Sequence, residues 1–417
     1  MARFEIEGPA ILQGKVEVGG TKNEALKLIA FSILLEKPIL FKNTPSILDV
    51  TKQLEIFESM GGSYKLNSHN LLIDSSKVSK TRLASTSARK LRASIVFIGP
   101  LLARFGKVTF PLPGGCLIGA RSINTHTDAF RQLGAVIEEK NLFLTLKLKD
   151  PVKKRVKLLE QSVTATENVV MYCAGVEKTI TIENCAIEPE IVHLCEIIKK
   201  AGAKIEGIGT KKLVITGSKK LELETATILS DRIEAATFVI AFLATHGAGE
   251  VFPYPKDNLE AFNKLLIQIG ANVSFTKNKA IVNKTESLKP FDIKTAVHPG
   301  FPTDLQSPIA LLMAIANGTS TINETMYENR LKYLELLNKM GLKVVMKDNH
   351  NAQITGPTDF KATKIDSLDL RSGITMIIAG LMAQGKTIVE NGQIIDRGYE
   401  SIEKKLIKLG AEIKRLK

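Results

Sequence analysis

The sequence of 417 residues contains no tryptophan and only six tyrosines, and it has four cysteines. With so few large aromatic rings, the chain offers few platforms on which the bases of single-stranded nucleic acid could stack. The cysteines Cys116, Cys173, Cys185 and Cys195 show no Cys-x-x-Cys spacing, so the sequence indicates neither a metal site of the zinc type nor a disulfide framework. We therefore expect reduced thiols in a cytoplasmic protein.

The sequence also lacks a hydrophobic run long enough to cross a bilayer. The most apolar stretches, residues 94–103, 235–244 and 374–383, are too short for a membrane span and predict buried helices. Residues 1–20 alternate apolar and polar side chains and lack the basic region and apolar core of a signal peptide. The sequence therefore predicts a protein without a membrane partner.

The remaining composition is that of a globular protein, with 44% hydrophobic and 24% charged residues. The length suffices for two or three domains. The net charge of +14 is compatible with nucleic acid, an anionic membrane or anionic small substrates as partners. The lysines are scattered and form no long basic run, so the charge alone does not choose among these partners.

A short glycine signature recurs along the chain and marks six repeats. Its central glycines follow one another at intervals of 73, 68, 68, 71 and 69 residues. These glycines are Gly61, Gly134, Gly202, Gly270, Gly341 and Gly410. The spacing predicts that six similar units make up the chain.

Each signature is predicted to end an amphipathic helix and to precede a strand. Before the last glycine, Tyr399, Ile402, Leu406 and Leu409 lie on one helical face. A glycine is favoured directly after the last helical residue. Each unit also has an earlier, more apolar helix, as at 23–35 and 307–316, and a strand between its two helices. Such strands are predicted at 39–43, 179–184, 319–323 and 386–391. We expect an α/β fold with helices inside and strands outside, in which the six units could form two domains of three.

The turn before the second helix carries an arginine in three of the units. These residues are Arg121, Arg330 and Arg397. A cation at the start of a helix opposes the helix dipole, and a single one is normally a solvated surface residue. Three arginines in equivalent turns suggest that they converge on an anion.

Residues 113–121 read Pro-Gly-Gly-Cys-Leu-Ile-Gly-Ala-Arg and predict a loop whose shape depends on its three glycines. Cys116 follows the Gly-Gly pair, and Arg121 ends the run. A thiol in an exposed loop beside a cation is reactive, and such a loop suits an anionic ligand. The alternative is a glycine-rich turn around a buried cysteine.

Nine segments together resemble the MurA family of enolpyruvyl transferases, which are UDP-N-acetylglucosamine 1-carboxyvinyltransferases. Their order and spacing match the family along the whole chain. The segments are Gly-Thr-Lys-Asn at 20–23, Leu-Arg-Ala-Ser at 91–94, the loop at 113–121, Ala-Thr-Glu-Asn at 165–168, Glu-Pro-Glu-Ile-Val at 188–192, Pro-Thr-Asp-Leu-Gln at 302–306, Glu-Asn-Arg at 328–330, Asp-Leu-Arg-Ser-Gly at 369–373 and Asp-Arg-Gly-Tyr-Glu at 396–400.

The resemblance implies an inverted, or inside-out, α/β barrel of two domains with three pseudo-repeats each. It assigns residues 22–228 to the domain that carries the Cys116 loop. Residues 1–21 and 229–417 form the other domain, which carries Asp304, Arg330, Arg371 and Arg397. The resemblance further implies an active site in the cleft between these domains.

The implied reaction moves the enolpyruvyl group of phosphoenolpyruvate to the 3′-hydroxyl of UDP-N-acetylglucosamine and releases phosphate through a tetrahedral ketal. It is the first committed step of peptidoglycan precursor synthesis and therefore belongs to cell wall biogenesis, cell shape, the cell cycle and cell division. The resemblance implies two small-molecule substrates, no cofactor, no metal, no nucleic acid and no membrane.

The family match also assigns roles to individual residues. Asp304 corresponds to the carboxylate that accepts the proton of the sugar hydroxyl, and Cys116 to the loop cysteine that fosfomycin alkylates. The match assigns phosphoenolpyruvate binding to Lys22, Arg92, Arg121 and Arg397. Cys116, Asp304, Lys22 and Arg397 are the implied catalytic residues. Further implied substrate contacts are Asn23, Ser122, Ile123, Asn124, Thr125, Ser162, Val163, Tyr327, Glu328, Arg330, Asp369 and Arg371.

Several positions depart from the family pattern on the side that is matched to the nucleotide sugar. Ser122 and Asn124 replace a usual proline and aspartate, Val96 replaces a common aromatic residue, and Thr164 replaces a usual glycine. The positions matched to phosphoenolpyruvate are intact. The sequence therefore predicts the reaction type more firmly than the affinity for the nucleotide.

The sequence leaves three alternative functions to be considered. The related enolpyruvyl transferase that uses shikimate 3-phosphate is disfavoured by the Cys116 loop and by the run at 165–168. A catalytically degenerate binding protein would be expected to lose the arginines, and none is lost. Nucleic-acid binding through the net positive charge would weaken steeply with salt. Taken alone, two of these residues also have structural interpretations. Asp304 could start a helix as an N-cap, and Asp396 with Arg397 could be a surface ion pair.

If Cys116 is the alkylated cysteine, fosfomycin will inactivate the wild-type protein. The Cys116→Asp variant will retain activity and escape inactivation, because its carboxylate can move a proton but offers no thiolate to the epoxide. Residual activity after incubation with the inhibitor measures both outcomes. A Cys116→Asp variant that is still inactivated would contradict the assignment.

Overall fold

The structure is a computed structural model that describes residues 2–83, 86–112, 123–149 and 154–416. These residues separate into two compact units. The first unit contains residues 2–19 and 230–416, and the second unit contains the described residues from 20 to 229. Each unit has its own apolar core.

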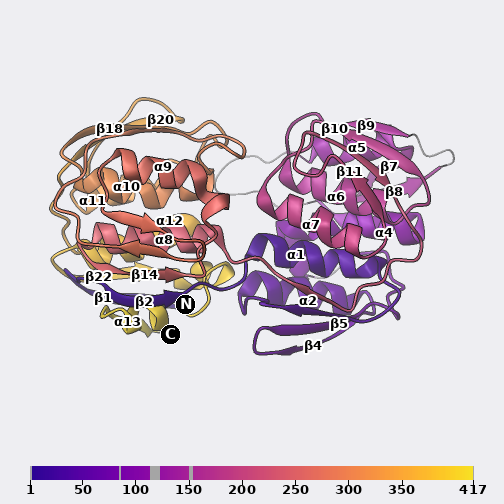
Figure 1. Cartoon of the computed structure of the whole chain (residues 1–417), viewed down its shortest axis with the longest axis horizontal. Coiled ribbons are helices and arrows are strands. Elements are labelled where there is room, and N and C mark those ends of the chain that lie inside the picture. Colours follow the sequence, from indigo (N-terminus) through magenta and orange to yellow (C-terminus); the bar gives the residue numbers. More distant parts are fainter. Residues whose placement is uncertain (1, 84–85, 113–122, 150–153, 417) are drawn as a thin grey trace. The chain divides into compact units, whose positions relative to one another are not determined.

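In the described part of the chain, each unit has three apolar central helices and three amphipathic outer helices, one of each kind in every repeat (Figure 1). In the second unit the central helices are α1 (Lys22–Phe31), α4 (Ile98–Phe105) and α6 (Val163–Ala174), and the outer ones are α2 (Leu48–Ser59), α5 (Asn124–Gln132) and α7 (Pro189–Lys200). In the first unit the central helices are α8 (Arg232–Ala244), α10 (Gln306–Ile315) and α12 (Leu370–Met382), and the outer ones are α9 (Glu260–Gln268), α11 (Tyr333–Lys339) and α13 (Ile402–Lys408).

The described residues also form shorter helical segments. They are η1 (Ser32–Leu34), α3 (Thr86–Lys90), η2 (Arg92–Phe97), η3 (Lys256–Leu259), η4 (Thr303–Leu305) and η5 (Gly392–Arg397).

The six signature glycines end the outer helices, as the sequence predicted. All six have positive φ angles, between 84° and 121°, which a residue with a Cβ rarely adopts. Each comes directly after the C-cap residue of its helix, as Gly410 follows Leu409 after α13. The glycine spacing therefore reports a repeated helix-to-strand turn.

The described strands form six small sheets, one for each repeat. In the second unit the sheets have the strand orders β13-β3-β5-β4, β6-β8-β7 and β11-β12-β10-β9. Their strands are β3 (Ile39–Lys42), β4 (Ser63–Asn67), β5 (Asn70–Asp74), β6 (Lys107–Pro111), β7 (Ala135–Lys140), β8 (Phe143–Leu148), β9 (Arg155–Lys157), β10 (Thr179–Glu183), β11 (Lys204–Glu206), β12 (Lys212–Thr216) and β13 (Thr225–Thr227).

The first unit has the orders β15-β16-β14-β2, β17-β18-β20-β19 and β21-β22-β1-β23. Their strands are β1 (Arg3–Gly8), β2 (Gln13–Glu17), β14 (Ala248–Phe252), β15 (Val273–Phe275), β16 (Ala280–Val282), β17 (Asp292–Lys294), β18 (Gly318–Asn323), β19 (Lys343–Met346), β20 (Asn351–Gly356), β21 (Lys364–Asp366), β22 (Gly385–Glu390) and β23 (Glu412–Leu416).

The two ends of the chain complete one sheet of the first unit. Strand β1 pairs antiparallel with both β22 and β23, and β2 runs parallel to β14. The indigo N-terminal strand therefore lies beside the yellow C-terminal strands in Figure 1. Residues 2–19 supply strands to two sheets whose other strands come from the C-terminal half of the chain.

The central helices are surrounded by protein, which explains their composition. Every residue of α8 is buried, including Arg232 and Glu234. The apolar runs at 94–103, 235–244 and 374–383 lie in η2 with α4, in α8 and in α12, so the prediction of buried helices is confirmed. Among the described residues, no helix is both long and apolar enough to cross a membrane. The fold is the inside-out α/β barrel that the family resemblance implied, with helices inside and strands outside in each unit (Figure 1).

Central helices α4 and α6 approach closely at Gly99. Its N–H donates to Asn168 Oδ1 over 2.8 Å, and an added Cβ would stand 2.0 Å from the Asn168 carbonyl oxygen. Gly99→Ala should therefore push the helices apart and reduce the free energy of unfolding by about 1–3 kcal/mol. Denaturant titration measures this loss.

The matched control is Gly19→Ala. A Cβ at Gly19 would meet its nearest neighbour, Glu234 Oε2, at 3.7 Å, which is an ordinary contact. Equal destabilisation by the two substitutions would contradict the steric explanation.

Candidate active site

Asp304 lies at the centre of an acid–base cluster in the first unit. Its Oδ1 accepts a hydrogen bond from Arg330 Nη2 over 2.7 Å, and its Oδ2 accepts one from Arg371 Nη2 over 2.9 Å. The arginine side chains are only 5% and 6% exposed, whereas that of Asp304 is 30% exposed. The carboxylate is thus held from its buried side by two cations and remains accessible to a ligand.

Local structure explains how the two arginines reach Asp304. Arg371 is in the first turn of α12, whose N-cap is Asp369. The Asp369 carboxylate accepts from the N–H groups of Arg371 and Ser372, and the Ser372 hydroxyl accepts from the Asp369 N–H, which is a capping box. Arg330 comes from the turn between β18 and α11, and its guanidinium carbon lies 5.3 Å from the centre of the Tyr327 ring.

Burial and pairing with a carboxylate shift the pKa values of these two arginines in opposite directions. Burial alone would lower the pKa of Arg330 and that of Arg371 by disfavouring the charged forms. The neighbouring Asp304 carboxylate more than offsets this effect, so both pKa values lie above the ordinary value. Both guanidinium groups therefore keep their charge.

A second buried carboxylate, Glu324, ties the Asp304 turn to the neighbouring strand. Glu324 is fully buried and follows β18 directly. It accepts hydrogen bonds from Thr303 Oγ1 (2.7 Å), Thr295 Oγ1 (3.0 Å) and the Met326 N–H (2.8 Å). Sequence reasoning did not single it out, although the polar end of the strand at 319–323 was a signal.

Asp304 and Asp396 have other partners than an N-cap role or an ion pair with Arg397 would give them. Asp304 directs its carboxylate to the two arginines, and η4 and α10 have no side-chain cap. Asp396 pairs with Arg415, with 2.9 Å from Arg415 Nη1 to Asp396 Oδ2. Arg397 is the last residue of η5 and is partly buried.

In the second unit, α1 presents a charged first turn. The Lys22 ammonium lies 3.5 Å from Asp49 Oδ2 at the start of α2. The neighbouring Glu24 is fully buried and accepts from the Leu229 N–H over 2.6 Å and from His193 Nδ1. These contacts fix the turn that also contains Asn23.

His126 forms a buried polar connection between α5 and α6. Its Nδ1 is 3.1 Å from Asn168 Nδ2, and its Nε2 is 3.2 Å from Thr164 Oγ1. An amide nitrogen only donates, so Nδ1 accepts and Nε2 carries the proton of the neutral ring. Burial lowers the pKa of His126 to about 3, and the positive charge of Arg92 contributes to the same shift. Thr164, which departs from the family pattern, is therefore a partner of this ring.

The structure places the remaining predicted residues as follows. In the second unit Arg92 starts η2, Ile123 is the N-cap of α5, Asn124 is its exposed first residue, and Ser162 is the N-cap of α6 just before Val163. The buried Thr125 donates to Glu160 Oε1 over 3.0 Å. In the first unit Glu328 is exposed and Tyr327 is partly buried. The predicted site residues Cys116, Arg121 and Ser122 lie outside the described residues.

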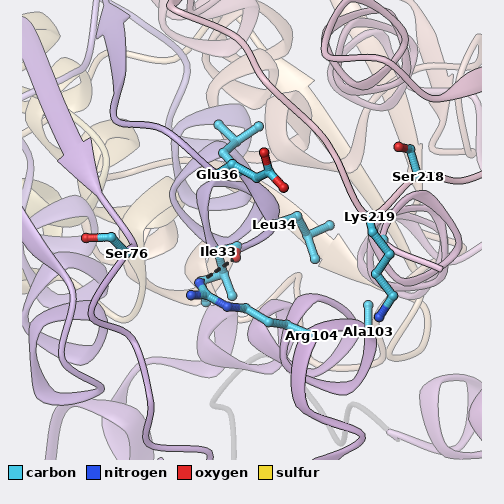
Figure 2. A pocket seen from close by; sticks show the side chains of 10 residues that line it. Ile33, Leu34, Glu36, Ser76, Ala103, Arg104, Ser218 and Lys219 are labelled. Carbon is cyan, nitrogen blue, oxygen red and sulfur yellow. Dashed lines mark hydrogen bonds between the residues drawn. The ribbon is translucent and has the colours of Figure 1, made fainter. Parts of the chain in front are cut away.

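A cavity of about 380 Å³ in the second unit lies away from these residues. It is at the C-terminal ends of the central helices, whereas Lys22 and Ser162 lie at N-terminal ends. Figure 2 shows Arg104 among the lining residues, where it donates to the Ile33 carbonyl over 2.9 Å. None of the predicted site residues lines this cavity. Within the described ranges, no group of three or more histidine, cysteine or acidic side chains could hold a metal ion.

The His126 environment predicts a pH dependence of stability. Its folded pKa of about 3 lies below the ordinary value of 6.5, so the unfolded chain takes up a proton first as the pH falls. This group should therefore reduce the free energy of unfolding by about 1.5 kcal/mol between pH 6.5 and about pH 5.

Comparing wild type with His126→Gln isolates this contribution, because other titrating groups are common to both proteins. Among them is Glu167, whose pKa burial raises to about 8, so that its effect on stability has the opposite sign in this range. The destabilisation caused by His126→Gln should be smaller at pH 5 than at pH 6.5. Equal destabilisation at both pH values would contradict a neutral buried ring.

Comparisons with known proteins show the family of the chain. The family model described as EPSP synthase (3-phosphoshikimate 1-carboxyvinyltransferase) matches residues 6–406. A UDP-N-acetylglucosamine 1-carboxyvinyltransferase of Prochlorococcus marinus is 42% identical over 99% of this chain and 91% of its own length. A UDP-N-acetylglucosamine 1-carboxyvinyltransferase 2 of Carboxydothermus hydrogenoformans is 39% identical over the full length of both chains.

Two solved structures share the fold. The enolpyruvyl transferase NikO from Streptomyces tendae has a TM-score of 0.91 at 21% identity and covers 99% of this chain and 98% of its own. EPSP synthase from Acinetobacter baumannii has a TM-score of 0.75 at 17% identity, with full coverage of both chains. At these identities the structures support the fold alone, whereas the full-length sequence relatives define the family. The chain belongs to the UDP-N-acetylglucosamine 1-carboxyvinyltransferase family of enolpyruvyl transferases.

Proposed function

We propose that this protein transfers the enolpyruvyl group of phosphoenolpyruvate to the 3′-hydroxyl of UDP-N-acetylglucosamine and releases phosphate. The observation that supports this function most directly is the partly exposed Asp304 carboxylate between the buried Arg330 and Arg371. The relatives that match along the whole chain carry the name of the same activity. The reaction would be the first step of peptidoglycan precursor synthesis, in the cytoplasm.

The reaction consists of an addition and an elimination. In the addition, the sugar 3′-oxygen bonds to C2 of phosphoenolpyruvate, its proton passes to a base, and a proton is added to C3. In the elimination, C3 of the tetrahedral ketal loses a proton and the bond from C2 to the phosphate oxygen breaks. The products are the enolpyruvyl ether and inorganic phosphate, and no net oxidation or reduction occurs.

Asp304 is the proposed base for the sugar hydroxyl. A general base needs hydrogen-bond reach to the proton that it accepts, and the side chain of Asp304 is exposed enough to be reached. Arg330 and Arg371 bind the two carboxylate oxygens and so fix the plane of the carboxylate. They would also stabilise negative charge that develops on the ligand.

Lys22, Arg92, Arg121 and Arg397 are the proposed ligands of the phosphate and carboxylate of phosphoenolpyruvate. Arginine recognises both groups through paired N–H donors, and lysine supplies a compact charge. Cys116 is the proposed proton donor or product-release group of its loop. Asn23, Ser122, Ile123, Asn124, Thr125, Ser162 and Val163, with Tyr327, Glu328 and Asp369, are proposed further substrate contacts or supports of them.

Shikimate 3-phosphate is the second candidate acceptor, because the matching family model is described by the enzyme that uses it. A direct test measures phosphate release from phosphoenolpyruvate with each acceptor separately. We expect release with UDP-N-acetylglucosamine and none with shikimate 3-phosphate. The reverse result, or no release with either, would refute the proposed function.

Asp304→Asn tests the proposed base in the same assay. The amide has nearly the shape of the carboxylate but cannot take the proton, so kcat should fall by about 10²–10⁴-fold. Loss of the carboxylate also leaves two buried guanidinium groups without their counter-charge, so thermal unfolding must be recorded as the control. A folded variant with wild-type kcat would exclude Asp304 as the base.

A further inference from the structure

A buried hydroxyl, that of Tyr399, contacts the arginine that holds Asp304. Tyr399 follows η5 and is 1% exposed. Arg371 Nη1 donates to its oxygen over 3.1 Å, and the same oxygen is 3.2 Å from Thr237 Oγ1 on α8. The guanidinium carbon of Arg371 also lies 5.6 Å from the centre of the Tyr399 ring. Tyr399 thus connects two central helices, α8 and α12, at the acid–base cluster.

The hydrogen bonds that link Arg371, Tyr399 and Thr237 have one consistent set of donors and acceptors. Thr237 Oγ1 donates its single proton to the Ile233 carbonyl over 2.7 Å, so it can only accept from Tyr399. Tyr399 therefore donates to Thr237, and its lone pairs face Arg371. Burial raises the pKa of Tyr399, so the hydroxyl keeps the proton that this order requires. This series of hydrogen bonds leads from Arg371 through Tyr399 and Thr237 to a backbone carbonyl of α8.

This order matters for Arg371 because a guanidinium is a rigid plane. Its Nη1 is bound to Tyr399 and its Nη2 to Asp304 Oδ2, while the Asp369 cap holds its backbone N–H. Fixing one corner of the fork determines where the other corner points. The position of the Tyr399 hydroxyl consequently limits the angle at which Arg371 meets the Asp304 carboxylate.

We propose that Tyr399 is a positioning residue of the enolpyruvyl transfer, which acts through Arg371 to set the orientation of the Asp304 carboxylate. The inference rests on the function proposed above. It gives the buried tyrosine a role that neither packing nor the match to the family assigns. A purely structural tyrosine would affect stability alone, whereas a positioning tyrosine affects the turnover of the folded enzyme.

The test compares Tyr399→Phe with wild type in steady-state assays with phosphoenolpyruvate and UDP-N-acetylglucosamine. We expect kcat to fall by about tenfold or more, while both KM values stay within about threefold, because small errors in the placement of a catalytic group reduce turnover. The matched control is Tyr254→Phe, which removes a buried hydroxyl of the same unit that donates to Asn263. This control should keep the wild-type kcat.

A double-mutant cycle with Arg371→Lys identifies the route of the effect. Lysine cannot bridge Tyr399 and Asp304 as the guanidinium fork does, so Tyr399→Phe should change kcat by less than about twofold in that background. If the two losses multiply in the double variant, Tyr399 does not act through Arg371 and the proposal is wrong. An unchanged kcat in Tyr399→Phe overturns it as well.

A third variant covers the case in which Tyr399→Phe does not fold. Thr237→Val keeps the tyrosine but removes the acceptor of its proton, so the hydroxyl hydrogen is no longer directed away from Arg371. It should lower kcat in the same direction by about threefold, and an unchanged kcat would contradict the proposal. A wild-type enzyme that releases no phosphate would instead refute the proposed function, which is a separate outcome.

Discussion

Two buried guanidinium groups beside a single carboxylate form the interaction on which the first unit depends. Removing such charges from water is unfavourable unless their donors meet acceptors in good geometry. Asp304 supplies one acceptor to each arginine, and Tyr399 supplies another to Arg371. The surrounding elements meet this requirement: Asp369 caps the helix that carries Arg371, and Glu324 anchors the turn that carries Asp304.

The second unit satisfies a similar requirement with different residues. At the N-terminal ends of α1 and α2, Lys22 pairs with Asp49, and in the middle of α1 the buried Lys27 lies 3.3 Å from Glu167 of α6. In both units the first turn of a central helix carries a charged residue, Lys22 in α1 and Arg371 in α12. This arrangement follows from the repeated unit, because an all-buried helix can only expose polar groups where it ends.

The sequence alone predicted the repeat, the alternation of helices and strands, and the buried helices. The reason is physical: a glycine with positive φ leaves a mark in the sequence at each helix end, as at Gly61 and Gly410, and the apolar runs mark the central helices. It also singled out Asp304, Arg330 and Arg371, which the structure brings within hydrogen-bond distance. Residue types with one dominant chemistry can be recognised from a family pattern.

Only the tertiary structure decided which partners these residues have. Asp396 pairs with Arg415, nineteen positions away, and Glu324 binds threonines from two other segments. No functional role could be assigned to His126, His193 or Tyr399 from the sequence, because the residue type of a hydroxyl or an imidazole does not show whether it has a hydrogen-bond partner in the folded protein. Their hydrogen bonds join segments that are separated in the chain, such as α8 and the segment after η5. Such contacts depend on how the repeats pack against one another, and no single segment of the sequence determines that packing.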